Sequence, residues 1–518
     1  MTAAAARPHD GRIVLAAAVA MVAVAAWPVL ATEFLPLLDY PNHLARMHVL
    51  LAYDDTPALH EFYEITWGAL PNLAMEMVVL PLAHLMPLAA AGKTFVVLCL
   101  AVQVAGVLAI HRALHGYWSP WPLAVVPILY NDTFLFGFVN YLFGFGLALL
   151  AFAGWIALAG RGLALRLAAG TLAGTLVWFC HLTAFGVYAI LVCAYEASRS
   201  IARWRAGGPL VGAGWLAALG QFAVPAILMF GFATTGEGGT TDWSFVTDKW
   251  HYFQKIDLVA DVFRTYDGWT DKATMILYAG AVGLGFALRR LAFARHGFLT
   301  VLGVGAAFAL APKKVLTGAF LDDRLAMTAV FVAVAAIDWR GVGRRWQYAA
   351  ASVLAVVLVV RVVAVEATWR TWDRQFAAYV RAIDALPEGA RLTAALGYCC
   401  DTWARRRPPL VHLPNYVITD RNGFFPLFFA IPGQQPVTVR PPYAARAKEV
   451  ENEISLRGMD HALGPNKGAR NPFLPEYLDG FDYVLAIRLD QFGAPPPPDL
   501  EAVVTGDNFG LYRIAPKN

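Results

Sequence analysis

The sequence predicts a polytopic α-helical membrane protein of about eleven transmembrane helices, with its N-terminus inside and a C-terminal extracytoplasmic α/β domain. Three observations support this class. The chain has 518 residues, of which 58% are hydrophobic and only 15% charged, whereas a soluble domain carries roughly 25% charged residues. Apolar runs long enough to cross a bilayer recur as far as residue 366. Beyond that point the pattern changes to an amphipathic helix and short strands.

The first apolar run extends from Ile13 to Ala31 and contains no charged residue. Because no small-residue cleavage site follows it, we expect a retained helix and not a signal peptide. Ten further spans are predicted, at 92–111, 119–131, 137–159, 164–180, 183–197, 209–232, 274–288, 297–312, 325–337 and 347–366.

Arginines orient these spans, because positively charged loops remain cytoplasmic. If the spans alternate, three arginine groups fall on the same side as the N-terminus: Arg199, Arg203 and Arg205, then Arg289, Arg290 and Arg295, then Arg340, Arg344 and Arg345. The outer side then receives loops 32–91, 233–273 and 312–324. We therefore predict a transmembrane domain over residues 1–366, which includes the long outer loop 32–91, and an extracytoplasmic domain over 367–518.

The long outer loop is expected to contain surface helices. Residues 42–53 form an amphipathic pattern, and residues 73–91 are apolar but interrupted by prolines, which favours a membrane-surface or partly inserted helix. In the C-terminal domain a helix pattern begins at Trp369, and strands are predicted at 391–396, 481–487, 501–505 and 509–514. The adjacent pair Cys399–Cys400 is compatible with a vicinal disulfide or with two free thiols.

Polar side chains follow several spans on the predicted outer side. Asp39 follows the first span, Asp132 the third, His181 lies between the fifth and sixth, and Arg324 begins the tenth. Ionisable groups at this depth are costly unless they face water, a partner or a substrate. Two carboxylates, a histidine and a cation could deprotonate an acceptor and hold a phosphate.

Each of these residues also has a structural interpretation. Asp39 could cap the following helix, Asp132 could be a turn residue, and His181 could bond the backbone at a helix end. Arg324 could form an ion pair with Asp322 or Asp323.

Four more residues are candidate substrate contacts. His43 and Arg46 lie on the outer-loop helix and could face the site together. Lys313 and Lys314 carry positive charge on the translocated side, where the charge rule does not expect it. The alternative for these lysines is a solvated helix end.

Other functional motifs are missing from the sequence. It contains no Walker A, Gly-x-Ser-x-Gly or His-Glu-x-x-His pattern. No basic or aromatic stripe indicates nucleic acid as a partner. The adjacent acids Asp54–Asp55 and Asp322–Asp323 lack nearby His or Cys at ligand spacing, so no metal ligand is assigned, although a divalent cation (Mg or Mn) stays open as a cofactor.

The arrangement resembles the GT-C fold of integral membrane glycosyltransferases, the group that includes dolichyl- and polyprenyl-phosphate-sugar dependent mannosyl- and arabinose-type transferases. The shared elements are an acid in a long outer loop after the first span (Asp39), surface helices in that loop, a second acid after the third span (Asp132) and an outer C-terminal domain. The segment from Pro312 to Leu325 resembles the late outer loop in which such enzymes contact the lipid phosphate. The residues two positions from Asp39 are Leu37 and Pro41, so the acid pair common in that group is missing there.

The resemblance implies inverting transfer from a polyprenyl-phosphate sugar to a glycan, lipid or protein acceptor at the outer face of the plasma (inner) membrane. Asp39 would be the general base, Asp132 would orient the acceptor or a cation, and Arg324 with Lys313 or Lys314 would stabilise the departing lipid phosphate. Two rival functions are a transporter or flippase and a non-catalytic membrane scaffold. The scaffold's candidate partner surface is the segment 405–416.

Overall fold

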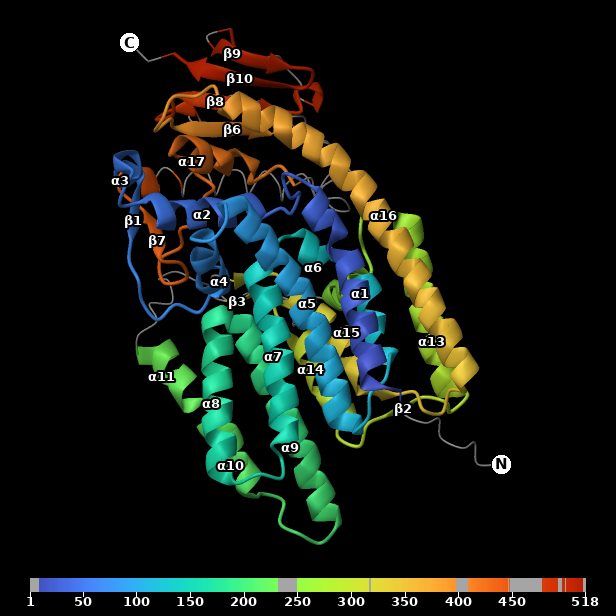
Figure 1. The fold of residues 1–518 in the computed structure, drawn as a ribbon. Coiled ribbons are helices and arrows are strands. Elements are labelled where there is room, and N and C mark those ends of the chain that lie inside the picture. Colours follow the sequence, from blue (N-terminus) through green and yellow to red (C-terminus); the bar gives the residue numbers. More distant parts are fainter. Residues whose placement is uncertain are drawn as a thin grey trace. The chain divides into compact units, whose positions relative to one another are not determined.

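The computed structural model describes residues 9–231, 249–315, 318–396, 409–445, 447, 478–491, 496–498 and 500–515 (Figure 1). Cys399–Cys400 and residues 405–408 lie outside these ranges. The chain divides into two compact units. The first unit comprises Met1–Ala31, Gly68–Met75 and Thr94–Ala367, and the second comprises Thr32–Trp67, Glu76–Lys93 and Thr368–Asn518.

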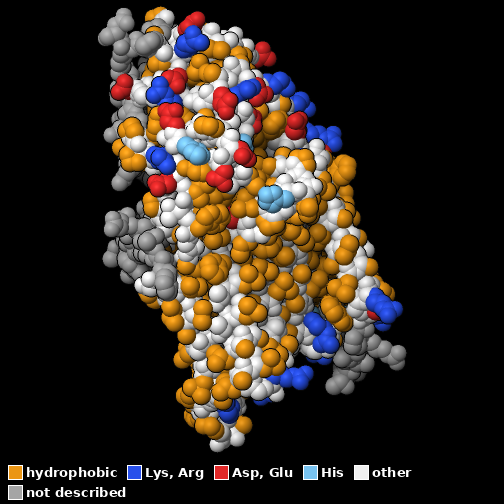
Figure 2. Space-filling model, turned by 60° about the vertical axis from the view of Figure 1, so that its left-hand side comes forward, with side chains coloured by type: hydrophobic (Ala, Val, Ile, Leu, Met, Phe, Trp, Pro, Cys, Tyr) orange, Lys and Arg blue, Asp and Glu red, His pale blue; other side chains and the backbone are white. Residues whose placement is uncertain are grey.

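The first unit consists mainly of long apolar helices. In the described part of the chain, six helices are long and apolar enough to cross a membrane: Gly11–Ala31 (α1), Leu88–His115 (α5), Val139–Ala157 (α7), Leu163–Cys180 (α8), Ala213–Gly231 (α10 and α11) and Arg344–Ile383 (α16). Hydrophobic side chains cover much of this unit on the face drawn in Figure 2. On α8, for example, Leu165, Leu172 and Leu176 are exposed. The protein is therefore a multi-pass membrane protein.

Helices also occupy most of the other predicted spans, namely Leu182–Arg205 (α9), Gly268–Ala287 (α13), Gly297–Leu310 (α14) and Leu321–Ala336 (α15). The predicted span 119–131 differs, because it contains only the eight-residue 3-10 helix η1, Trp121–Ile128. Pro122 and Pro127 lie within η1 and lack the N–H groups that a regular α-helix needs. The count of about eleven spans therefore stays a prediction.

Two further spans differ from the sequence prediction in their boundaries. The span 209–232 is divided into Ala213–Gly220 (α10) and Ala223–Gly231 (α11), and Gln221 at the break accepts a hydrogen bond from Tyr188 at 2.7 Å. The span 347–366 and the helix expected to begin at Trp369 are one continuous helix, the 40-residue α16. No Gly or Pro interrupts its sequence, so nothing local ends it.

Close packing in the first unit depends on small residues. A Cβ atom added at Gly146 of α7 would lie 2.8 Å from the carbonyl carbon of Val102 in α5 and 2.9 Å from the backbone nitrogen of Gln103. A side chain at this position would therefore force the two backbones apart.

The second unit contains a four-stranded sheet of order β6-β8-β10-β9. Its strands are Leu392–Leu396 (β6), Tyr483–Ile487 (β8), Leu500–Gly506 (β9) and Phe509–Ile514 (β10), so all four predicted strands are present. β6 pairs with β8 in parallel, and β10 pairs antiparallel with both β8 and β9. All five residues of β8 are buried, as a central strand covered on both faces requires.

The remaining elements of the second unit come from the long loop and the C-terminal part. The predicted surface helix 42–53 is α2, Tyr40–Ala52. The predicted segment 73–91 forms the short helix Ala74–Ala83 (α4) and the first residues of α5. A small antiparallel ladder that the sequence prediction missed joins Tyr63–Ile65 (β1) to Val437–Val439 (β7). Tyr416–Arg421 (α17) follows the 3-10 helix Leu413–Asn415 (η3).

One buried side chain connects several segments of the first unit. Arg361 in α16 is 2% exposed. Its Nε donates to the carbonyl of Pro127 at 2.7 Å, and its Nη2 donates to the carbonyls of Tyr130 at 3.1 Å and Phe263 at 2.9 Å. Its Nη1 pairs with Asp271 of α13 at 3.0 Å. The charge is therefore both paired and hydrogen-bonded, as burial requires.

We predict that Arg361→Met destabilises the protein by about 3–5 kcal/mol, because Asp271 and three backbone carbonyls lose a buried donor. Unfolding of the purified protein by SDS titration in mixed micelles measures the change. Arg374→Met on the exposed part of α16 is the matched control, with an expected effect within about 0.5 kcal/mol. Equal stability of the two variants would contradict a structural role for Arg361.

Candidate functional site

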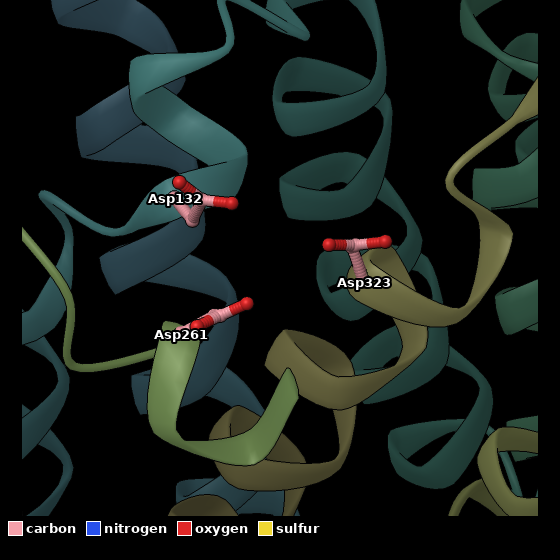
Figure 3. Close-up of side chains that lie close together, drawn as sticks. All are labelled: Asp132, Asp261 and Asp323. Carbon is pink, nitrogen blue, oxygen red and sulfur yellow. The ribbon is translucent and has the colours of Figure 1, made fainter. Parts of the chain in front are cut away.

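Three aspartates of the first unit place their carboxylates around a common space. Asp132 begins α6 (Asp132–Leu135), Asp261 ends α12 (Lys249–Asp261), and Asp323 lies in the first turn of α15. One carboxylate oxygen of each lies within 4.8 Å of the other two. Figure 3 shows the three side chains directed toward one another from these separate elements. We refer to them as the aspartate triad.

The neighbouring sequence explains how Asp132 reaches the triad. The side chain of Asn131 accepts a hydrogen bond from the backbone N–H of Phe134 at 3.1 Å, so Asn131 is the N-cap of α6. Asn131 also donates to the carbonyl of Ile128 at 2.9 Å. The N-cap of α6 is thus Asn131, and Asp132 is the first helical residue. The Arg361 hydrogen bond to Tyr130 holds the chain two residues before Asp132.

Two buried cations bring Asp261 and Asp323 together. Lys255 in α12 pairs with Asp322 in α15 at 3.0 Å and also donates to the carbonyl of Ala311 at 2.9 Å. Its ion pair therefore holds α12 against the first turn of α15. Arg361 bonds the carbonyl of Phe263, two residues after Asp261.

The start of α15 is a tight turn at a bulky residue. Phe320 has φ +59°, in the left-handed region that a residue of this size rarely adopts. Such a conformation costs of order 1–3 kcal/mol and persists only when surrounding structure holds it. The ring of Phe320 packs 4.9 Å from that of Phe136, which itself stacks on Phe138 at 4.8 Å. This aromatic cluster sets the direction in which Asp323 and Arg324 leave the turn.

The negative charges of the three triad carboxylates repel one another. Because their oxygens lie within 4.8 Å of one another, two ionised carboxylates repel each other by at least about 3 kcal/mol at an effective dielectric constant of about 20. Arg264 offsets part of this charge at 2.6 Å from Asp261. Three carboxylates from separate elements are hard oxygen donors that fit Mg²⁺, Mn²⁺ or Ca²⁺.

Two of the predicted site residues, His181 and Arg324, contact the same tyrosine, Tyr141, in the first unit. The Tyr141 ring lies 5.5 Å from that of His181, and the Tyr141 hydroxyl donates to the Arg324 carbonyl at 2.9 Å. The Arg324 guanidinium lies 4.2 Å from the Phe138 ring centroid and donates to the carbonyl of Ala319 at 2.8 Å. Burial lowers the pKa of His181 well below its usual value, and the positive charge of Arg324 adds to this effect.

The structure also bears on the alternatives for the predicted residues. The Nδ1 of His181 accepts a hydrogen bond from the backbone of Thr183 at 3.0 Å, so His181 has the helix-end partner considered from the sequence. Lys313 is exposed, with its ammonium 5.6 Å from the Phe320 ring centroid. Lys314 belongs to strand Lys314–Val315 (β3), and its side chain lies outside the described part.

Asp39 belongs to a polar cluster in the second unit. It occupies the N-cap position of α2 without a side-chain capping hydrogen bond, so the capping interpretation is not observed. One carboxylate oxygen, Oδ1, lies 3.5 Å from Nε2 of His412. Both residues are buried, at 7% and 8% exposure. His412 therefore contacts Asp39 although it comes from a distant segment that had no assigned site role.

His43 and Arg46 lie on the same side of α2 as Asp39, because the spacings of four and seven residues return to one helix face. The His43 ring packs against Phe429 at 6.1 Å. Arg46 is fully buried and donates from Nε to Glu76 at 2.6 Å. A buried ion pair of this kind holds α2 to the adjoining helix segment and is costly to break.

Comparisons with known proteins identify the fold. No family model matches the chain, and no curated protein sequence matches it. Among solved structures, that of ArnT from Cupriavidus metallidurans bound to undecaprenyl phosphate is similar, with a TM-score of 0.50 and 10% sequence identity. The alignment covers 98% of this chain and 100% of ArnT. The chain has the GT-C fold. The resemblance that the sequence indicated is confirmed at the level of fold.

Within the GT-C fold, sequence reasoning missed two residues. Asp261 lies in the segment assigned to outer loop 233–273, where no helix was predicted, and nothing marked it among the other acids. His412 lies in the segment 405–416, which was considered as a partner surface. A signal for His412 was its isolation as the one histidine or charged residue type between Arg407 and Asp420.

We predict that Mn²⁺ binds the aspartate triad and that Asp261→Asn weakens this binding by more than about 10-fold, because a ligand carboxylate is lost. Electron paramagnetic resonance of free Mn²⁺ during titration of the purified protein measures the affinity. Asp257→Asn, an exposed acid on the same helix, is the matched control and should bind Mn²⁺ as the wild type does. Equal Mn²⁺ binding by wild type and Asp261→Asn would contradict the assignment.

Proposed function

We propose that this protein is a membrane glycosyltransferase that moves a sugar from a polyprenyl-phosphate donor to an acceptor on the extracytoplasmic face, with inversion at the anomeric carbon. The observation that carries the proposal is the GT-C fold, matched over 98% of the chain to a protein solved with undecaprenyl phosphate. The buried acids and cations described above provide the groups that such a reaction needs.

Asp39 acts as the general base in this proposal. The acceptor hydroxyl oxygen attacks the anomeric carbon and forms the new glycosidic bond, while the bond from that carbon to the phosphate oxygen breaks. The hydroxyl proton moves to the Asp39 carboxylate, and the electron pair of the broken bond leaves on the lipid phosphate. A single displacement of this kind inverts the anomeric configuration. Burial of Asp39 at 7% exposure limits competition from water for the carboxylate.

Arg324 binds the lipid phosphate and stabilises the charge that develops on it. Arg324 lies in the first turn of α15, directly after Asp323 of the aspartate triad, and its guanidinium contacts Phe138 and the Ala319 carbonyl. A planar guanidinium can form paired hydrogen bonds to phosphate oxygens. Lys313 and Lys314, in the same turn region before α15, add positive charge for the phosphate. His181, whose ring packs against Tyr141, contacts substrate as a neutral group.

A divalent cation would be held by Asp132, Asp261 and Asp323. When bound, it would offset negative charge on the donor phosphate. Asp132 thereby retains its predicted role of orienting a cation or the acceptor. His43 and Arg46 line the α2 face that carries Asp39, where they contact the acceptor.

The proposal includes the topology predicted from charge. The protein then lies in the inner membrane, crosses it about eleven times and has its N-terminus on the cytoplasmic side. With this topology, loop 32–91 and residues 367–518 are on the periplasmic side. Polyprenyl-phosphate donors reach such a site laterally through the bilayer, so no nucleotide-binding loop is required.

We predict that Asp39→Asn abolishes sugar transfer, with a loss of about 100-fold or more, because the base is removed while the side-chain size is kept. The assay incubates protein in nanodiscs with a panel of undecaprenyl-phosphate sugars and detects released undecaprenyl phosphate by mass spectrometry. Asp54→Asn, an exposed acid just after α2, is the matched control and should retain activity. Transfer by Asp39→Asn at the wild-type rate would overturn the role of the base.

We predict that Arg324→Gln weakens undecaprenyl phosphate binding by about 10- to 100-fold, the loss of a charge-assisted contact worth about 1.5–3 kcal/mol. Native mass spectrometry with increasing undecaprenyl phosphate measures lipid occupancy directly and needs no turnover. Arg289→Gln removes an exposed charge of the first unit and should leave lipid binding unchanged. If both variants bind lipid equally, Arg324 is not the phosphate contact.

A further inference from the structure

His412 reaches Asp39 from a loop that also contacts Asn42. His412 precedes η3, and its ring packs 4.8 Å from that of Phe429. Its Nε2 faces Oδ1 of Asp39 at 3.5 Å, and its Nδ1 lies 3.3 Å from Nδ2 of Asn42. Each ring nitrogen therefore faces one polar side chain of α2 or its N-cap.

Two backbone groups fix which way the Asn42 amide points. The backbone N–H of Phe429 donates to Oδ1 of Asn42 at 2.8 Å, and Nδ2 of Asn42 donates to the carbonyl of Leu427 at 2.7 Å. A backbone N–H can only donate and a backbone carbonyl can only accept. The amide cannot be turned over without placing like groups against each other. Asn42 is fully buried, so water does not replace these partners.

The orientation of Asn42 determines the tautomer of His412. Since Nδ2 of Asn42 is a donor, its contact with Nδ1 of His412 requires that Nδ1 accept and carry no proton, although the carbonyl of Leu427 also hydrogen-bonds the His412 ring. In a neutral imidazole the proton then resides on Nε2, the atom that faces Asp39. Burial lowers the pKa of His412 to about 4, so the ring is neutral at pH 7. Asp39 therefore faces a neutral N–H donor and not an imidazolium ion.

We propose that His412 is a positioning residue for Asp39, in which the Asn42-fixed tautomer presents a neutral Nε2–H to the carboxylate and holds its orientation toward the acceptor hydroxyl. The inference rests on the proposed role of Asp39 as the general base. A neutral donor stabilises the carboxylate in its ionised, proton-accepting form. An imidazolium would instead form an ion pair that weakens the base.

Two substitutions of His412 separate donor placement from side-chain volume. Glutamine can place an amide N–H near the position of Nε2, whereas the shorter asparagine reaches only that of Nδ1. We expect His412→Gln to retain kcat within about 5-fold and His412→Asn to lower kcat by about 100-fold, with the donor KM changed less than about 3-fold. Equal kcat for the two variants, or a loss expressed in KM alone, overturns the inference.

A spectroscopic measurement reads the tautomer without any activity. In full-length protein labelled with ¹⁵N-histidine, the His412 signals are those lost in His412→Gln. We expect an unprotonated Nδ1 and a protonated Nε2 in the wild type at pH 7, and a proton on Nδ1 in Asn42→Asp, whose carboxylate can only accept. A wild-type Nδ1–H signal overturns the inference even if the kinetic variants fail to fold.

The outcomes distinguish this inference from the proposed function. If Asp39→Asn retains transfer, the proposed role of Asp39 as the general base is refuted. The tautomer signals still report whether Asn42 determines which nitrogen of His412 carries the proton. If Asp39→Asn is inactive and His412→Asn keeps the wild-type kcat, Asp39 remains the base and the positioning role of His412 is refuted.

Discussion

The buried guanidinium of Arg361 is the interaction on which the first unit's site depends. It bonds three backbone carbonyls and Asp271, and two of those carbonyls lie two residues from Asp132 and Asp261. A charge inside an apolar helix bundle is costly unless it is paired and hydrogen-bonded. The segments that supply hydrogen-bond acceptors to the Arg361 guanidinium must therefore lie against α16, and Arg361 holds them together. Together with the Lys255–Asp322 pair, it explains how mutually repelling carboxylates are held within 4.8 Å.

The two units differ in how their buried charged groups are arranged. The first concentrates charge at the start of α15, where Asp323 of the aspartate triad directly precedes Arg324, whose guanidinium lies over an aromatic ring. Such a region suits an anionic phosphate with its counter-ion. In the second unit the carboxylate of Asp39 is buried beside the side chains of His412 and Asn42. A proton acceptor needs that setting, because adjacent cations would lower its basicity.

Much of the fold was predictable because its signals are local. Apolar length located the long helices, and alternation with β-branched and aromatic residues located all four strands of the sheet in the second unit. Errors arose where local signals conflict: prolines turned span 119–131 into η1, and the lack of Gly or Pro let α16 continue past residue 366. Asp39, Asp132 and Arg324 could be proposed as site residues from the sequence because they lie beside predicted spans. Asp261 and His412 were not, because their importance comes from tertiary contacts with residues far away in sequence.

The most direct test of this account is an experimental structure of the protein in nanodiscs with undecaprenyl phosphate and Mn²⁺. The account predicts cation density among Asp132, Asp261 and Asp323, and lipid phosphate density in contact with the Arg324 guanidinium. Phosphate bound elsewhere in the first unit, with Arg324 still directed to the Ala319 carbonyl and no cation among the three carboxylates, would contradict it.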